Sequence, residues 1–165
     1  MWRVSVELES VIRFTADNIG NILSTKRIAD LMTADGRKID QKAVEKYLST
    51  LCESFFLYEV KRYNIKGKQL LKTLGKYYLV DIGLRRMLLG SRSFDAGRIL
   101  ENIVYLELLR RQKKVYIGKM DNLEVDFVAI DENDMRTRRQ IMMALSVSMR
   151  WNGWWGKYKP MQPIW

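Results

Sequence analysis

Three carboxylates between Gly97 and Phe127 are of types and spacing that could bind a divalent metal ion. Glu124 and Asp126 lie two residues apart in an apolar stretch that predicts a strand, so both would project from one face about 7 Å apart. Glu101 lies in the preceding predicted helix, at the edge of its apolar stripe of Leu100, Ile103 and Val104. Carboxylate oxygens suit Mg²⁺. The three residues are therefore candidates for catalysis and metal binding, against the alternative that they form the solvated side of an edge strand.

Metal-dependent cleavage of nucleic acid needs further groups that this sequence lacks. The following strand should carry an acid or amide and then a lysine two residues later, and the segment Gln140-Ile141-Met142 has no lysine. The chain has no histidine, which excludes histidine-based acid–base catalysis and histidine-containing zinc sites. Gly67-Lys68 and Gly75-Lys76 lack the other residues of a phosphate-binding loop. We therefore expect no enzyme activity and no cofactor.

The elements that would position the carboxylates follow a longer helical pattern. The order of helix, helix, turn, helix and β-hairpin predicts a winged helix-turn-helix. Its expected helices are residues 4–16, 24–31 and 40–54, and its strands are 56–63 and 69–80. Ser24 or Thr25 would cap the second helix, with Leu31 among its inward-facing residues, and Phe55 would belong to the apolar stripe of the third. A short helix over 81–89, a helix over 97–111 and strands over 114–118 and 123–130 would follow.

The fold class expected from this pattern is α+β, with three parts. Residues 1–90 would form the winged helix, 91–137 a truncated α/β nuclease-like half-domain, and 138–165 an anomalous tail. The boundary would lie in Ser91–Ala96. A half-domain whose sheet has lost strands would leave the apolar face of the 97–111 helix partly exposed, which predicts marginal stability or aggregation.

Lysines of the winged helix are the candidate nucleic-acid-binding residues. Lys42 and Lys46 lie on the third helix, where three acids outnumber two lysines, whereas the hairpin combines several basic residues with no acid between them. The hairpin candidates are Lys66, Lys68 and Lys72. The alternatives are that these lysines only keep the hairpin soluble, or that the third helix docks a protein partner. Reversing the three hairpin charges would separate the readings, since only DNA binding predicts a salt-sensitive loss.

The composition places the excess of basic charge mainly in the tail. The net charge is +10, but residues 135–165 contain six Lys or Arg and no acid, which leaves 23 basic and 19 acidic residues in 1–134. A single cysteine, Cys52, lies on the apolar side of its predicted helix and indicates a reducing compartment. No apolar run is long enough to cross a membrane. We expect a cytoplasmic protein.

Several segments together resemble the C-terminal half of a family of prokaryotic AAA-type ATPases that includes the domain of unknown function numbered 4143. The matching segments are DNIGNILSTKRIADLM, VEKYLSTL, KRYNIKGKQLLKT, KYYLVDIGLR, GRILENIVYLELLRR, VYIGK and EVDFVA. The resemblance implies a winged helix followed by a domain similar to PD-(D/E)xK nucleases. Glu101 would match the helix acid of that domain and Asp126 its strand aspartate. The third nuclease motif is degenerate in the family.

The chain departs from that family twice, because it lacks the ATPase module and loses the pattern after about Asp134. Residues 135–165 contain five of nine Met, four of five Trp and both Pro. We interpret this composition as a frameshift near residues 138–148, with a genuine basic-aromatic tail that binds membrane or nucleic acid as the alternative. The expected function is a non-catalytic C-terminal fragment of an ATPase, with a winged helix that contacts DNA. The alternatives are a protein-docking module and a Mg²⁺-dependent nuclease.

Overall fold

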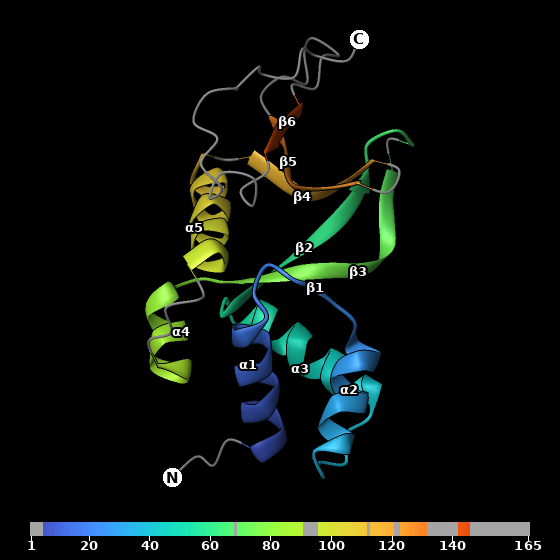
Figure 1. Cartoon of the computed structure of the whole chain (residues 1–165), viewed down its shortest axis with the longest axis vertical. Coiled ribbons are helices and arrows are strands. Elements are labelled where there is room, and N and C mark those ends of the chain that lie inside the picture. The colour runs from blue at the N-terminus through green and yellow to red at the C-terminus, as the bar shows by residue number, and fades with distance from the viewer. Residues whose placement is uncertain are drawn as a thin grey trace. The chain divides into compact units, whose positions relative to one another are not determined.

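The computed structural model describes residues 5–67, 69–90, 96–111, 113–120, 123–131 and 142–145. The chain forms two compact units, one of residues 1–59 with 74–93 and one of residues 60–73 with 94–165. Five helices and a six-stranded sheet are present in the described residues, which confirms the expected α+β class. Figure 1 labels the elements in chain order. They are α1 Val6–Asp17, β1 Ile22–Leu23, α2 Thr25–Ala34, α3 Gln41–Glu53, β2 Leu57–Asn64, β3 Gln69–Leu79, α4 Ile82–Leu89, α5 Ala96–Arg110, β4 Lys113–Met120, β5 Leu123–Asp131 and β6 Met142–Leu145.

The first four helices begin where a short polar side chain accepts a hydrogen bond from a backbone amide of the first turn. Ser24 caps α2 by accepting from Arg27 N at 3.4 Å, and Asp40 caps α3 by accepting from Ala43 N at 2.7 Å. Ser5 and Asp81 act in the same way on α1 and α4. Such caps satisfy amides that have no partner within the helix. The sequence located the first turns of α2 and α3 from their capping residues.

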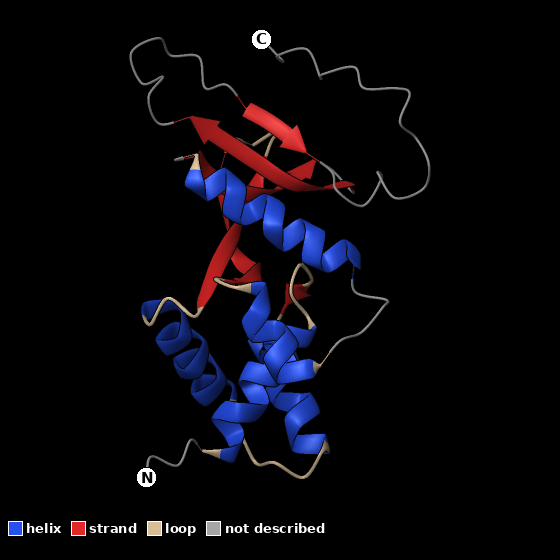
Figure 2. Cartoon of the chain, turned by 90° about the vertical axis from the view of Figure 1, so that its left-hand side faces the viewer, coloured by secondary structure: helices blue, strands red, loops and turns tan. Residues whose placement is uncertain are grey.

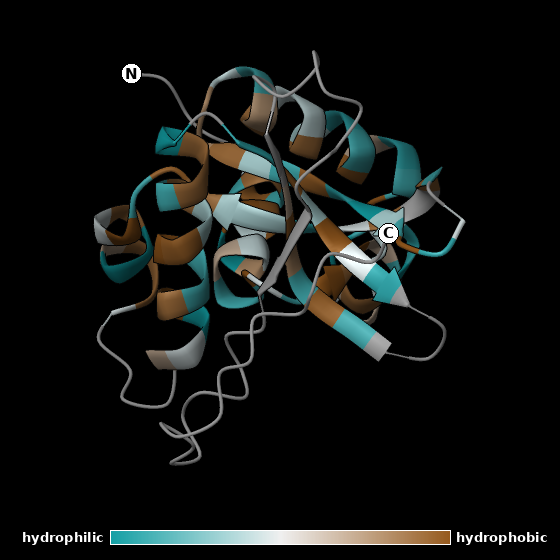
Figure 3. Ribbon diagram, turned by 90° about the horizontal axis from the view of Figure 1, so that it is seen from above, coloured by the Kyte–Doolittle hydropathy of each residue, from teal (hydrophilic) through white to brown (hydrophobic). Residues whose placement is uncertain are grey.

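The core of the first unit is formed by apolar stripes of α1, α2 and α3. Figure 3 shows how apolar and hydrophilic bands alternate along the ribbons. The buried side chains recur at the three- and four-residue spacing of amphipathic helices. They are Val11 of α1, Ile28, Ala29 and Met32 of α2, and Val44, Leu48 and Leu51 of α3, joined by Leu57, Tyr77 and Leu79 from the strands.

Two arginines attach α4 to α1. Arg85 is only 3% exposed, and its Nε donates a 2.8 Å hydrogen bond to the carbonyl oxygen of Ala16, in the last turn of α1. Arg13 of α1 donates in return to the carbonyl oxygen of Leu88. Because the last carbonyls of a helix have no partner within it, a cationic donor there is favourable.

The sheet has the strand order β1-β3-β2-β4-β5-β6. β1 pairs antiparallel with β3, with Ile22 opposite Lys76. β2 pairs in parallel with β4, with Arg62 opposite Ile117, and the pairs β4–β5 and β5–β6 are antiparallel. Figure 2 colours the strands red and the helices blue. Residues 60–73, which include the turn of the β2–β3 hairpin, belong to the second unit. The sequence analysis placed the whole hairpin in the winged-helix part, residues 1–90.

In the second unit, α5 packs against β4 and β5. The buried residues of α5 are Asn102, Tyr105 and Leu108, and the ring of Tyr105 stacks on Phe127 of β5. Leu100 and Ile103 of the expected apolar stripe are 37% and 49% exposed, which agrees with the partial exposure expected for this face of the helix.

Three further local expectations differ from the structure. Helix α2 continues through Ala34, so Met32 is buried and the predicted inward residue Leu31 is 45% exposed. Phe55, expected in the stripe of α3, is 70% exposed because it follows the helix end with a left-handed φ of 56°. Strand β6 lies inside the segment 138–165 that was expected to be an anomalous tail. The other residues of that segment lie outside the described part of the chain.

Candidate nucleic-acid interface and carboxylate strand

The outer face of α3 is polar and open to solvent. Helix α2 and helix α3 pack through the buried stripe described above, which leaves the opposite side of α3 uncovered within the first unit. The exposed residues of this face are Gln41, Lys42, Glu45, Lys46, Ser49, Thr50 and Glu53. We refer to these seven residues as the α3 face. It contains two of the candidate nucleic-acid-binding residues.

Each acid on or next to the α3 face accepts hydrogen bonds from neutral donors. Asp40 accepts from the backbone amide of Ala43, and Glu53 Oε1 accepts from Ser49 Oγ at 2.8 Å. The third acid, Glu45, accepts through Oε1 from Gln41 Nε2 at 2.7 Å and from Thr25 Oγ1 at 3.1 Å.

The lysines of this face have no such partner. Neither Lys42 nor Lys46 forms an ion pair with any residue that the structure describes. Both side chains are exposed. The sequence gave more acids than lysines on this helix. The contacts show that the acids accept hydrogen bonds from neutral groups of α2 and α3, whereas the two lysines form no ion pair among the described residues.

The hairpin candidates have different outcomes. Lys66 is exposed at the turn between β2 and β3, where Gly67 N donates to Asn64 Oδ1 at 2.9 Å. Lys68 lies outside the described residues, and the structure places Lys72 in β3 without describing its side chain. Lys76, another basic residue of this hairpin, is only 4% exposed. Since residues 62–64 of β2 pair with β4, one edge of this hairpin is covered.

The carboxylate strand β5 contains a bulge at the candidate aspartate. Tyr116 of β4 is opposite Val128 and Gly118 is opposite Val125, so Asp126 and Phe127 together face the single residue between them, Ile117. Bulges re-aim side chains and are frequent beside functional sites. The extra residue breaks the strict alternation on which the sequence prediction depended.

The bulge changes which side chains share a face. A Cβ on Gly118 would lie 2.7 Å from Val128 Cγ2 and 3.0 Å from Val125 Cβ, so these two valines flank Gly118 on one face. Phe127, next to Val128, points the other way and stacks on Tyr105 of α5. The prediction that Val125 and Phe127 project together is therefore wrong.

The candidate metal ligands are not gathered into a recognisable site. Glu124 is exposed, while Glu101 and Asp126 are half-buried, and each of the three interacts with other groups. Among the described residues, no group of three or more His, Cys, Asp or Glu is arranged to bind a metal ion. Gln140 and Ile141 of the expected third motif lie outside the described part, and Met142 begins β6.

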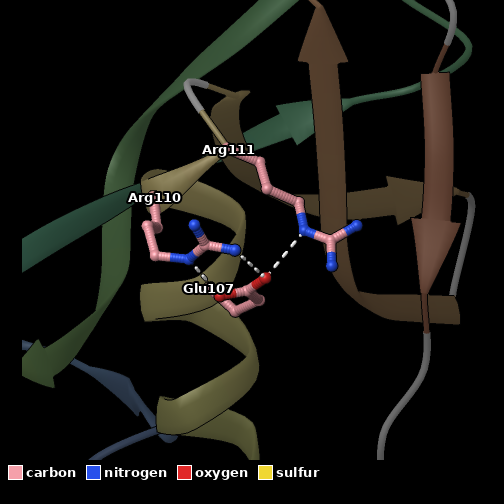
Figure 4. Close-up of polar contacts among 3 residues, drawn as sticks. All are labelled: Glu107, Arg110 and Arg111. Carbon is pink, nitrogen blue, oxygen red and sulfur yellow. Dashed lines mark hydrogen bonds and ion pairs between the residues drawn. The ribbon is translucent and has the colours of Figure 1, made fainter.

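Glu107 forms ion pairs with two arginines at the end of α5. Figure 4 shows both arginines converging on its carboxylate. Arg110 donates from Nε to Oε2 at 2.7 Å and from NH2 to Oε1 at 2.8 Å, and Arg111 Nε donates to Oε1 at 2.8 Å. These hydrogen bonds lower the pKa of Glu107 to about 2. The side chain is 40% exposed, and the group stabilises the last turn of α5 without forming a catalytic site.

Cys52 has the environment of a structural cysteine. It is a free, half-buried thiol packed against the core of the first unit. Burial raises its pKa to about 11, and the negative charges of Glu59 and Glu53 act in the same direction. A thiol with a raised pKa is a poor nucleophile at neutral pH.

The first unit also has an open groove of about 690 Å³ between α1, α2 and α4. Its apolar lining includes Val6, Phe14, Leu31 and Leu88, and charged residues such as Glu9 border it.

No helix in the described ranges has the length and apolar character needed to cross a membrane.

Comparisons with known proteins find similarity only to proteins of unknown function. The family described as "Domain of unknown function (DUF8612)" matches residues 3–95, whereas the resemblance pointed to domain 4143. An uncharacterized protein of Haemophilus influenzae is 43% identical over 122 residues, 74% of this chain and 30% of that protein. Uncharacterized protein MJ1544 of Methanocaldococcus jannaschii is 33% identical over 117 residues, 68% of this chain and 26% of that protein. No solved structure matches. The chain thus spans less than a third of either relative.

Proposed function

We propose that this chain, which belongs to the family described as Domain of unknown function (DUF8612), is a non-catalytic part of a longer protein and binds double-stranded DNA through its first unit. Helix α3 would enter the major groove. Lys66 at the turn of the β2–β3 hairpin belongs to the second unit and is a separate candidate for phosphate contact. The order α1-β1-α2-α3-β2-β3, with β1 paired to β3, supports a winged helix-turn-helix. In that motif the second helix of the pair is the one that reads DNA.

One observation carries the proposal. The α3 face presents Lys42 and Lys46 without ion-pair partners among the described residues, while its acids are occupied by neutral donors. Unpaired lysines are the groups that replace counterions along the phosphate backbone, which supplies most of the affinity for duplex DNA. Both lysines are exposed and form no ion pair among the described residues, so DNA binding would not have to break one.

Fluorescence anisotropy with a labelled duplex over a range of salt concentrations tests this proposal. Lys42→Gln and Lys46→Gln should each weaken binding and each reduce the slope of log affinity against log salt by about 1. Arg86→Gln is the matched control, since it removes one exposed charge from α4, outside the α3 face. An equal loss in all three variants would indicate a general charge effect. The absence of duplex binding at low salt would favour the protein-docking alternative.

The hairpin is tested separately. Charge reversal at Lys66, Lys68 and Lys72 should cause a further salt-sensitive loss if the hairpin contacts phosphates. Lys76 is excluded from this set because it is buried, and its substitution would disturb the sheet.

The longer protein is proposed to be an AAA-type ATPase. The resemblance described from the sequence supports this context, and the chain covers only 30% and 26% of its two relatives, which leaves ample length for such a module. Resequencing the gene with roughly a kilobase on each side would test it. A phosphate-binding loop upstream and an acid-rich helix in another frame downstream would support the ATPase and the frameshift. An isolated gene that encodes the same tail would contradict both.

A further inference from the structure

We propose that Glu45 reads a cytosine in the major groove and gives this protein a sequence preference. The inference rests on the proposed binding of duplex DNA by α3. It concerns the one acid on the α3 face that is held by two side chains from two different helices, Gln41 of α3 and Thr25 of α2.

The two hydrogen bonds orient the carboxylate. Gln41 Nε2 and Thr25 Oγ1 both donate to Oε1, at 2.7 Å and 3.1 Å. Within the described residues no hydrogen bond is made to Oε2, so this oxygen is available to accept one from a base. Glu45 is exposed, and the two partners that the structure describes for it are neutral. An oriented carboxylate acceptor is thus presented on the surface that would face DNA.

The chemistry of the base edges selects one partner for such an acceptor. In the major groove cytosine presents its N4 amino group, which can donate to a carboxylate. Guanine presents the acceptors N7 and O6, and thymine presents O4, so both repel it. Adenine has one donor, N6, but its neighbouring N7 acceptor favours an amide side chain over a carboxylate. Glu45 is therefore suited to cytosine.

Lys42 and Lys46, which precede and follow Glu45 in the sequence, increase the effect of this selection on affinity. Lys42 and Lys46 attract the helix to any duplex, whereas an unneutralised carboxylate between them opposes binding wherever it meets no donor. Specificity is a difference between affinities, and a group that repels wrong sequences contributes as much as one that attracts the right sequence. Glu45 would lower the affinity for most duplexes and keep it for sites with cytosine at one position.

Selection from a randomised duplex library, followed by sequencing, tests the inference with three proteins. The wild type should enrich sites with cytosine at one position, by roughly 10-fold over the other bases. Glu45→Gln keeps an Oε1 that can accept from Gln41 and Thr25, but it presents the donor Nε2 outward, so the same position should lose cytosine and favour bases that present an acceptor. Glu53→Gln removes an equal charge from the same helix and should keep the cytosine preference.

A third variant tests the positioning residue. Thr25→Val removes one donor to Glu45 and should reduce the discrimination between cytosine and the other bases. The inference is overturned if the wild type shows no base preference, or if Glu45→Gln keeps the same preference. In both cases salt-dependent duplex binding would persist and the proposed function would stand. Failure of the wild type to bind any duplex at low salt would overturn both.

Discussion

The ring of Tyr105 stacks on the ring of Phe127, with centroids 6.1 Å apart and an interplanar angle of 26°. Tyr105 is on α5 and Phe127 on β5, and the two side chains are 4% and 0% exposed. This contact joins the helix of the second unit to its sheet. Phe127 is one of the two residues at the bulge of this strand.

We predict that Phe127→Ala destabilises the second unit by about 3–5 kcal/mol, because it leaves a cavity beneath α5 and removes the aromatic pair. Guanidinium unfolding followed by circular dichroism measures the change. Leu100→Ala on the exposed side of the same helix should change stability by less than about 0.5 kcal/mol. Equal effects of the two substitutions would contradict the observed rotation of α5.

Phe55→Gly should stabilise the first unit by roughly 0.5–1 kcal/mol. Phe55 has a φ of 56°, and its amide donates to Cys52 O while the amide of Phe56 donates to Leu51 O. This pattern is a Schellman helix end, where glycine relieves the steric cost of the left-handed conformation. Phe55→Ala is the control, because it removes the exposed ring but keeps a Cβ. A gain in thermal stability for alanine as large as that for glycine would show that the ring, not the backbone, is responsible.

Two glycines should respond in opposite directions to alanine. Gly118→Ala would place a Cβ 2.7 Å from Val128 Cγ2 and 3.1 Å from Ile65 Cδ1, and should cost about 1–3 kcal/mol. Gly97→Ala meets nothing within 4 Å in helix α5 and should stabilise it by about 0.5–1 kcal/mol. Urea unfolding of both variants measures the difference. A destabilised Gly97→Ala would contradict the described helix start.

Acid should weaken the ion pairing of Glu107. Its pKa is lowered from 4.5 to about 2 by its bonds to Arg110 and Arg111, so the stabilisation is complete above pH 4.5 and disappears as the pH falls through about 2. An NMR titration of the carboxyl carbon should give a midpoint near 2 at low salt. Replacing both arginines by glutamine should move that midpoint toward 4.5. A midpoint near 4.5 in the wild type would show that the ion pairs do not form in solution.

Cys52 should react slowly with thiol reagents while the protein is folded. Its pKa of about 11, against an ordinary 9.0, reduces the thiolate fraction about 100-fold at neutral pH. Labelling with a chromogenic disulfide at pH 7 should therefore be at least that much slower in the native state than in denaturant. Fast labelling of the native protein would show that the end of α3 opens readily.

The sequence predicted α2 and α3 from a capping residue together with a stripe at helical spacing. Asp40 and the residues Val44, Leu48 and Leu51 illustrate this for α3. Strand β1 was missed, since two residues carry no periodic signal and pair only because β3 lies alongside. Strand β6 was missed because its composition indicated a tail.

The site was less predictable than the helices, for two physical reasons. A bulge depends on pairing between β4 and β5, so the face of Phe127 could not follow from simple alternation. The clamp on Glu45 depends on Thr25, twenty residues away in the chain, and is visible only once α2 and α3 are packed. The residue types of α3 suggested that its acids repel phosphates. The contacts add that these acids bind neutral donors and that Lys42 and Lys46 form no ion pair among the described residues.

The parallel pairing of β2 with β4 has a consequence during synthesis of the protein. Arg62 leaves the ribosome 55 residues before its partner Ile117, which corresponds to ~3–11 s at typical elongation rates. Throughout that interval the hydrogen-bonding edge of β2 has no neighbour, and an open edge can recruit a strand of another chain. Exposed Lys61 on this strand, and the charged residues around it, would discourage such pairing between nascent chains until β4 emerges.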